Sequence, residues 1–442
     1  MQRLHHKYLL LLLDNRILLP FDESFCCKYM IKFGIIQNYL YFCQRNNTIY
    51  SLMKRICFVV DSIFSIGGVQ RVTAVIAKEL AKNYDVSIVT FDKPEQLDKS
   101  LYNLSDSNIT YKFVSYPKVG KIKNYICKAY SWFYLKLQPQ SKWCSDLYAH
   151  SSYQSELRNT LLSELQQSQY DIIIGVHAPL AARLATLKKH LPGTKCIGWL
   201  HNSYEAIFGE NSHYYIGAKR RRHYIYQFRK LDNVVVLCNF DANSYYNYDS
   251  KFRPTVIYNP LTLVAANTSL GTSKHFLAVG RFSHKHKGFD LLIKAFSLFA
   301  KNNKGWYLDI VGEGPEEELY RELIKENNMD ERISIHPFTN DIQKYYSNAQ
   351  IYVLSSRWEG FGLVLVEAMA HGLPVISSDL PTSIEIMGDF GMYFENGNIE
   401  DLAQKLEEAT HIDWQAKSKE ALAIAQRFDI KNIIKQWKEL IE

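Results

Sequence analysis

Residues 351–374 hold an apolar segment, a glycine-containing turn and a second apolar segment, in that order. Ile351–Leu354 is a short continuous apolar run of the kind that forms a buried parallel strand. Gly360 and Gly362 mark the turn, and the apolar residues after them recur at helical spacing until Gly372 stops the helix. A strand, a turn and a helix in this order belong to a βαβ unit, so the segment predicts an α/β fold with a parallel sheet.

The same alternation of strand and helix patterns continues through most of the 442 residues. This length exceeds that of one ordinary domain, and we therefore expect two doubly wound, Rossmann-like domains. The first domain is predicted to end with a strand near Val256–Asn259, which is followed by Pro260 and a polar stretch. The other predicted strands are Ile56–Val60, Val86–Thr90, Ile172–Val176, Cys196–Leu200, Val234–Leu237, Phe276–Val279, Leu308–Val311, Ile333–Ile335, Ile351–Leu354 and Val375–Ser378.

Two glutamates flank the glycine-containing turn. Glu359 precedes it, and Glu367 lies in the predicted helix, where its side chain leans back toward the helix start. The free N–H groups of a helix start form an anion site, and glycines let a ligand approach the backbone closely. A diphosphate bound there would have a hydroxyl-binding acid on each side, as a nucleotide-sugar requires. The alternative is two solvated glutamates, but the apolar neighbours of Glu367 favour the binding site.

A basic loop follows the predicted strand Phe276–Val279. Arg281 stands directly after this strand, and Lys287 precedes the next predicted helix. Ligands of open α/β sheets bind at the carboxyl ends of the strands, where these two cations could neutralise a diphosphate leaving group. A solvated basic loop is the other interpretation, and the matching glutamate pair argues against it.

These segments together resemble a known family. Gly280-Arg281, Lys287-Gly288, the run Val311 to Pro315 and the segment Glu359 to Glu367 occur in the order seen in the retaining glycosyltransferases of family four, which have the GT-B fold. The resemblance covers roughly residues 53–442, and its C-terminal motifs are the specific ones. It implies an acceptor-binding domain over 53–258, a nucleotide-sugar-binding domain over 259–427, and a final helix over 428–442 that packs back across both domains.

The resemblance also implies roles for single residues on the donor side. Glu359 would position the donor sugar and Glu367 the ribose, while Arg281 and Lys287 would stabilise the leaving diphosphate. The remaining residues expected at the donor site are Gly360, Phe361, Gly362, Leu363, Gly67, Gly68, Gly312, Gly314 and Phe338.

On the acceptor side the strongest candidate is His201, which follows the predicted strand Cys196–Leu200. A histidine at this position in the family lies near the transferred sugar. His177 ends another strand and is the rival, although a lone histidine is more often structural. Asn202 and Glu205 are expected to contact acceptor. Gly67-Gly68 could also be an ordinary strand-to-helix turn, and Arg71, which follows them, is expected to face the cleft.

The implied reaction is transfer of a hexose or N-acetylhexosamine from a nucleotide-sugar, most commonly a UDP-sugar in this family, with retention of configuration. The expected acceptor is a lipid-linked glycan in bacterial surface polysaccharide synthesis. No metal or other cofactor is expected, since the chain lacks the Asp-x-Asp motif of metal-dependent GT-A transferases. The alternatives are a non-catalytic GT-B scaffold subunit and a GT-B sugar phosphorylase or epimerase.

Charge divides the chain unequally. Residues 1–260 carry 33 Lys and Arg against 19 Asp and Glu, a net charge of +14, whereas residues 261–442 carry 19 against 26, a net charge of −7. Within the basic half, residues 118–143 mix six lysines with six aromatic residues, and residues 219–222 form a second basic cluster. Such surfaces suit an anionic membrane face. A solvated helix is the alternative, and no nucleic-acid-binding motif accompanies the charge.

Residues 1–52 contain leucine-rich and aromatic patches without strand–helix alternation, and Met53 directly precedes the first convincing strand. We interpret this segment as a poorly ordered appendage or an upstream mis-start, with a membrane-touching arm as the alternative. It lacks the pattern of a signal peptide. None of the eight cysteines forms a Cys-x-x-Cys pair, which indicates scattered thiols in a reducing compartment. The predicted location is the cytoplasm, with peripheral attachment to the inner face of the membrane as the alternative.

Overall fold

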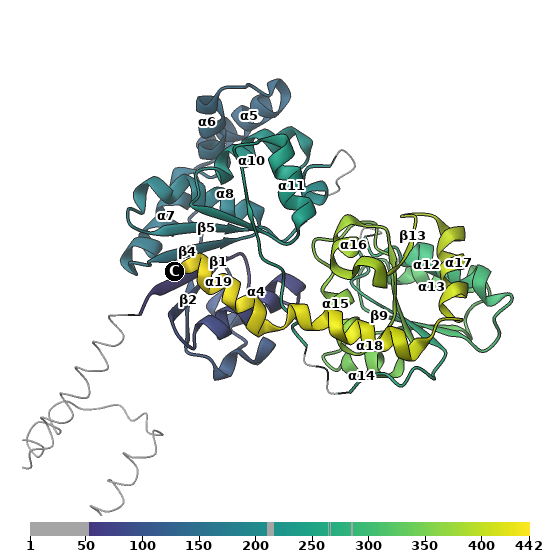
Figure 1. Ribbon diagram of the computed structural model, residues 1–442. Helices are drawn as coiled ribbons and strands as arrows, with labels where there is room; N and C mark the ends of the chain where they lie inside the picture. Colours follow the sequence, from purple (N-terminus) through teal and green to yellow (C-terminus); the bar gives the residue numbers. More distant parts are fainter. Residues whose placement is uncertain (1–52, 210–215, 264, 266, 284–285) are drawn as a thin grey trace, which may run out of the picture. The chain divides into compact units, whose positions relative to one another are not determined.

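A computed structural model describes residues 53–209, 216–263, 265, 267–283 and 286–442. Lys54–Glu442 form one compact unit (Figure 1). The appendage predicted over residues 1–52 lies outside the described residues.

The first sheet has seven parallel strands in the order β3-β2-β1-β4-β5-β6-β7. Because β1 pairs with β2 on one side and with β4 on the other, the strand order reverses at this point, and loops leaving β1 and β4 diverge there. Its strands are β1 (Arg55–Val60), β2 (Asp85–Thr90), β3 (Ile109–Phe113), β4 (Ile172–Val176), β5 (Lys195–Trp199), β6 (Asn233–Val236) and β7 (Thr255–Val256).

The second sheet has six parallel strands in the order β10-β9-β8-β11-β12-β13. Its order reverses between β8 and β11, which pair directly. Its strands are β8 (His275–Val279), β9 (Tyr307–Val311), β10 (Ile333–His336), β11 (Ile351–Leu354), β12 (Val375–Ser378) and β13 (Met392–Phe394). Two doubly wound, Rossmann-like α/β domains are therefore present, as the strand–helix alternation predicts.

Helices connect successive strands and cover the sheets. Those associated with the first sheet are α4 (Gly68–Leu80), α5 (Lys121–Leu137), α6 (Lys142–Ser152), α7 (Ser155–Gln167), α8 (Ala178–Leu187), α9 (Tyr204–Phe208), α10 (Arg221–Phe228) and α11 (Asn239–Tyr248). Those that follow the strands of the second sheet are α12 (Phe289–Ala300), α13 (Glu317–Glu326), α14 (Gln343–Asn348), α15 (Leu363–Ala370), α16 (Pro381–Met387), α17 (Ile399–Ala409) and α18 (Trp414–Ala425), and α19 (Ile430–Ile441) ends the chain.

Each of the ten strands predicted from apolar runs is present, with ends shifted by at most one residue. The strand expected near Val256–Asn259 is the two-residue β7. The sequence reading missed β3 and β13, which lie at the edges of the two sheets. Edge strands are paired on one side only and are half exposed, so Ile109–Phe113 alternates with polar residues and Met392–Phe394 is too short to form a recognisable apolar run.

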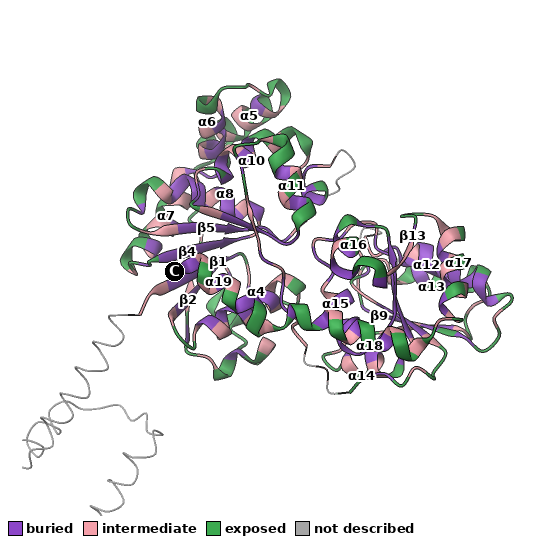
Figure 2. Cartoon of the chain, in the orientation of Figure 1, coloured by how far each residue is buried: buried purple, intermediate pink, exposed green. Residues whose placement is uncertain are grey.

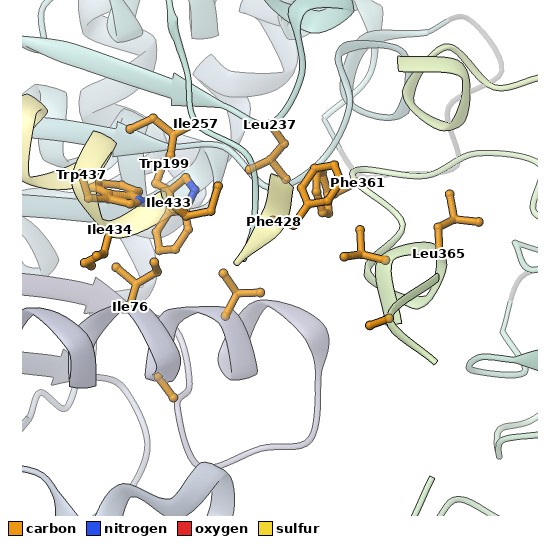
Figure 3. Packing of buried hydrophobic residues seen from close by; sticks show 14 of the residues in the cluster. Ile76, Trp199, Leu237, Ile257, Phe361, Leu365, Phe428, Ile433, Ile434 and Trp437 are labelled. Carbon is orange, nitrogen blue, oxygen red and sulfur yellow. The ribbon is translucent and has the colours of Figure 1, made fainter. Parts of the chain in front are cut away.

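The last two helices connect the two halves of Lys54–Glu442. α18 packs on α15, and α19 packs on α4. The fully buried Trp437 of α19 meets Trp199 at the end of β5, with ring centroids 4.8 Å apart. Phe428, between α18 and α19, packs edge-on against Phe361 in the turn before α15. One continuous apolar cluster therefore joins both sheets through the C-terminal segment (Figure 3).

None of the helices in the described part of the chain is both long enough and apolar enough to cross a membrane.

Candidate active site

Two loops leave the adjacent strands β8 and β11 at the point where the order of the second sheet reverses, and they are joined by hydrogen bonds. The Arg357 N–H donates to the His286 carbonyl over 2.8 Å, and the Ser355 hydroxyl donates to the Lys287 carbonyl over 2.8 Å. Gly288 adopts a φ of +64°, and a Cβ placed there would lie 1.9 Å from the Ser355 carbonyl oxygen. Only glycine permits this approach, which brings the basic loop onto the glutamate loop.

Glu359 is buried between these loops, with 8 % of its surface exposed. Its Oε1 accepts hydrogen bonds from Lys287 Nζ at 2.6 Å and from the Ser356 hydroxyl at 2.7 Å, and His286 Nε2 lies 4.0 Å away. Burial raises the pKa of Glu359, but the Lys287 ammonium, His286 and these hydrogen bonds outweigh it, so the net pKa is lowered. The side chain is therefore a paired carboxylate at neutral pH.

Glu367, in α15, is buried as well, with 2 % exposure. One carboxylate oxygen forms an ion pair with Arg71 of α4 and accepts a hydrogen bond from the Thr262 hydroxyl at 3.1 Å. The other oxygen accepts from the Tyr346 hydroxyl at 3.1 Å. The pair between Arg71 and Glu367 joins a helix of the first sheet to a helix of the second.

The starts of α4 and α15 face each other. A Cβ on Gly68 would lie 3.3 Å from the Leu363 side chain, and a Cβ on Gly360 would lie 2.2 Å from the His201 carbonyl oxygen. Gly362 has a φ of +80° and precedes the first residue of α15. Two helix N-termini, each with unpaired N–H groups and a partial positive charge, thus point into one region, which suits a diphosphate.

Arg281 is exposed at the same region, and its guanidinium donates to the Ile66 carbonyl over 3.2 Å. The glycine turn before α4 is held by Tyr102, whose hydroxyl accepts from the Gly67 N–H at 2.9 Å and donates to the Ser65 carbonyl at 2.8 Å. These contacts place Arg281 beside the start of α4. Both predicted cations, Arg281 and Lys287, belong to the loop that borders Glu359.

The two histidines treated as rivals lie together. His177 and His201 follow neighbouring strands, and their ring centroids are 5.4 Å apart. His201 also packs on Trp199 at 4.2 Å, and its Nε2 is buried without a hydrogen-bond partner in the described part of the molecule. Burial lowers the pKa of both imidazoles, which are therefore neutral at pH 7. A neutral imidazole with a free nitrogen can hydrogen-bond a sugar hydroxyl.

Three of the predicted donor-site residues, Gly312, Gly314 and Phe361, have a structural role in the fold. A Cβ on Gly312 would lie 1.9 Å from the Gly280 carbonyl oxygen, and a Cβ on Gly314 would lie 2.3 Å from the Phe282 carbonyl oxygen. These glycines let the loop after β9 touch the loop after β8. Phe361 is 3 % exposed and packs in the apolar cluster, so only its backbone can face a ligand.

The remaining candidates lie at element ends. Phe338 follows β10 and is 40 % exposed, as a base-stacking residue must be. Asn202 is half-buried beside His201, whereas Glu205 is exposed on α9. No hydrogen bond in the described part of the chain joins Glu205 to His201 or Glu359.

Sequence reasoning missed several residues that hold the two glutamates. Ser356 stands three positions before Glu359, a spacing that could have signalled their contact. Thr262 and Tyr346 lie 105 and 21 residues from Glu367 and carry no local signal. In the described ranges no three His, Cys, Asp or Glu side chains are grouped as a metal ion would require.

Comparison with known families covers both halves of the molecule. The model of the Glycosyltransferase Family 4 matches residues 66–263, and that of the Glycosyl transferases group 1 matches residues 263–427. An uncharacterized glycosyltransferase of Haemophilus influenzae is 28 % identical over 400 residues, which are 88 % of this chain and 100 % of the relative.

Other relatives align over a shorter part. The poly(ribitol-phosphate) alpha-N-acetylglucosaminyltransferase of Staphylococcus aureus is 29 % identical over 38 % of this chain and 36 % of its own length. The O-antigen biosynthesis glycosyltransferase WclY of Escherichia coli is 27 % identical over 38 % of this chain and 49 % of its own. This chain thus spans half or less of the length of these two enzymes.

Solved structures share the fold. TarM superposes with a TM-score of 0.68 at 16 % identity, and Anabaena HepE in complex with UDP-glucose superposes with a TM-score of 0.67 at 19 % identity; each match covers 88 % of this chain and 99 % of the other. With the two family models spanning residues 66–427 and the paired sheets built as in these structures, the chain belongs to the group 1 glycosyltransferases of the GT-B fold.

Proposed function

We propose that this protein transfers a hexose or N-acetylhexosamine from a UDP-sugar to a glycan acceptor with retention of configuration and without a metal ion. The observation that carries the proposal is the buried pair of Lys287 and Glu359, 2.6 Å apart, beside Arg281 and the facing starts of α4 and α15. This arrangement combines cations, helix N-termini and a hydroxyl-binding carboxylate in one region.

The charges assign parts of the donor to parts of the site. The diphosphate lies at the two helix starts, where Arg281 and Lys287 supply the positive charge that a metal ion supplies elsewhere. Glu359 accepts hydrogen bonds from the sugar hydroxyls. The ribose hydroxyls take the place of Arg71 on Glu367, whose other oxygen keeps its hydrogen bond to Tyr346.

The transfer step balances without a protein nucleophile. The bond between the sugar C1 and the diphosphate oxygen breaks, and a bond forms between C1 and the acceptor hydroxyl oxygen on the same face. The acceptor proton passes to the departing phosphate oxygen. Neutral His201, at the end of β5, orients the sugar through its unpartnered Nε2.

The names of the relatives support a role in bacterial polysaccharide synthesis. Relatives are named for O-antigen biosynthesis and for glucosylation of poly(glycerol-phosphate). We therefore assign this protein to bacterial surface polysaccharide synthesis, with a lipid-linked acceptor.

The test is UDP release from a panel of UDP-hexoses and UDP-N-acetylhexosamines by the purified protein, with and without EDTA. We expect slow UDP release that EDTA does not affect. Glu359→Gln should reduce the rate at least ~100-fold, because the substitution removes one contact that stabilises the transition state. The matched control is Glu318→Gln, an exposed glutamate of α13.

Three outcomes contradict the proposal. Absence of UDP binding in calorimetry indicates a scaffold subunit. Conversion of the free nucleotide-sugar into an epimer, or dependence of turnover on inorganic phosphate, indicates an epimerase or a phosphorylase. An inverted anomeric proton coupling in the product, measured by NMR, contradicts retention.

A further inference from the structure

Helix α5 presents an unusual amount of apolar surface. Tyr134 is its only buried residue. Figure 2 shows most of the helix as exposed. Its large exposed apolar side chains, with their exposed fractions, are Ile122 (80 %), Tyr125 (77 %), Ile126 (61 %), Trp132 (63 %), Phe133 (51 %) and Leu137 (60 %). Trp143, at the start of α6, is 70 % exposed. Contiguous surfaces of this kind mark interaction sites.

These apolar side chains share one face of the helix. They recur at intervals of three and four residues, so they form a stripe along α5, here named the outer face. The opposite face packs against the domain. Tyr134 stacks on Tyr148 of α6 with ring centroids 4.4 Å apart, and Lys123 Nζ donates a hydrogen bond to Glu156 Oε1 of α7 over 2.7 Å. The helix is therefore held in place by its inner face while the outer face remains uncovered by the described residues.

The charge around the outer face has one sign. Residues 107–145 contain seven lysines and no Asp or Glu. Lys112 and Lys123 form ion pairs with glutamates of α7. The other five are exposed, namely Lys118, Lys121, Lys128, Lys136 and Lys142. Lys136 Nζ lies 4.9 Å from the ring centre of Trp132, so apolar and basic groups are interleaved on the same surface.

This combination distinguishes a membrane from a protein partner. Tryptophan, tyrosine and aliphatic side chains beside lysines are the composition of helices that lie in the headgroup region of anionic bilayers. Protein–protein interfaces are depleted in lysine, whereas each lysine near an anionic bilayer contributes to binding. The second basic cluster does not share this role, because Arg221 and Arg222 donate to the Phe208 and Gln140 carbonyls of the domain itself.

A polar cavity of 420 Å³ lies beside the lysine-bearing edge of α5. The residues that line it include Lys128, Asn124, Ser131, Ser151 and Ser152, and none of them is Asp or Glu. Ammonium, amide and hydroxyl donors suit a phosphate headgroup.

We propose that the outer face of α5, with Trp143 and the five exposed lysines, docks this protein on an anionic phospholipid bilayer, with the helix axis parallel to the membrane plane. The surface is separate from the loops that hold Glu359 and Glu367, so docking and donor chemistry can be tested independently.

The experiment is flotation of the full chain with vesicles of equal parts phosphatidylglycerol and phosphatidylcholine, and with vesicles of phosphatidylcholine alone. Binding is expected only to the anionic vesicles. Trp132→Gln combined with Phe133→Gln should lower the partition coefficient at least ~10-fold, because two apolar groups leave the interface. Lys121→Gln and Lys128→Gln should each lower it about fivefold, and 0.5 M salt should reduce that difference.

Leu270→Gln is the matched control, since Leu270 is 81 % exposed in the linker before β8 and should not affect binding. All variants should retain the thermal midpoint and UDP release of the unaltered protein. If the unaltered protein releases no UDP, the proposed donor site is contradicted, and the docking proposal is not affected.

The proposal is overturned if the full chain does not float with anionic vesicles, or if the double variant at Trp132 and Phe133 floats as well as the unaltered protein. It is also overturned if no vesicle binding occurs and light scattering shows a dimer for the unaltered protein but a monomer for the double variant. That result would make the outer face an interface between two copies.

Discussion

The loops around Glu359 and helix α5 use charge in opposite ways. In these loops and the adjoining helix α15, the carboxylates are buried and paired, with Glu359 bound to Lys287 and Glu367 bound to Arg71. On α5, Lys123 pairs with Glu156, but Lys121, Lys128 and Lys136 are exposed, and residues 107–145 contain no Asp or Glu. Paired buried charges define a rigid geometry for a small ligand, whereas unpaired exposed charges favour an extended anionic surface.

Buried titratable groups beside the two sheets also differ in whether they carry a charge. Glu359, beside the second sheet, keeps its charge because a cation is adjacent. His201 and His223, beside the first sheet, are neutral because burial lowers the pKa of both imidazoles, and His177 lowers that of His201 further. The two regions should therefore respond differently to substitution and to pH, and four measurements test this difference.

The largest effect on stability is expected from Lys287→Met. The substitution leaves Glu359 buried without its cation, which should cost about 3–5 kcal/mol of unfolding free energy. The side chains of the pair are only 14 % and 8 % exposed, so solvent screens their interaction little. Denaturant unfolding measures the loss. The double variant Lys287→Met with Glu359→Gln should recover part of it, and equal losses in both variants would contradict the buried-charge explanation.

Arg281→Ala should separate catalysis from stability. Arg281 is exposed, so its removal should change the unfolding free energy by less than ~0.5 kcal/mol. Removal of a charge that stabilises the leaving diphosphate should lower kcat/KM for the donor about 100-fold or more. Arg321→Ala, on exposed α13, is the control. A loss of stability as large as that of Lys287→Met would remove the contrast between the two cations.

One part of the pH response should arise from His223 in the first domain. Burial lowers the pKa of His223 to about 3, while the unfolded side chain titrates near 6.5. Because the folded pKa is the lower one, the unfolded state binds the proton first, and stability is lost as pH falls below 6.5. Between pH 7.5 and 5 the loss should be about 2 kcal/mol. His223→Gln should flatten this slope in unfolding experiments, and an unchanged slope would contradict the assignment.

Tyr346→Phe should destabilise the protein less than Lys287→Met or the titration of His223. Its hydroxyl donates one of the hydrogen bonds to Glu367, which keeps Arg71 and Thr262. Loss of one hydrogen bond should cost about 1 kcal/mol in unfolding free energy. A cost above ~3 kcal/mol would show that Tyr346, rather than Arg71, compensates the buried carboxylate.

The placement of the four charged residues expected at a donor site was largely predictable, because these residues are close in sequence. Glu359 and Glu367 belong to one strand, turn and helix, and Arg281 and Lys287 belong to one loop, so their spacing alone limits where they can lie. Their partners were not predictable in the same way. Arg71 is separated from Glu367 by 296 residues, and no local pattern signals such a contact.

For helix α5, the sequence showed the composition but not which side chains would be buried. Its basic and aromatic composition is apparent in the sequence and is compatible with both a membrane-docking helix and a solvated helix. The sequence has aromatic residues on more than one side of this helix, so composition did not reveal that Tyr134 would be covered while Trp132 and Phe133 would stay exposed. Burial of one face depends on α6 and α7, which follow later in the chain.

The amino-acid sequence by itself determined the parallel α/β architecture, the positions of ten strands along the chain and the family, because apolar periodicity and short-range spacing are local properties. Tertiary structure alone decided that Arg71 neutralises Glu367, that His177 and His201 lie together, and that Trp437 braces the strand ending at Trp199. These contacts join residues far apart in the chain, and their geometry follows from how the helices pack on the two sheets rather than from any pattern along the sequence.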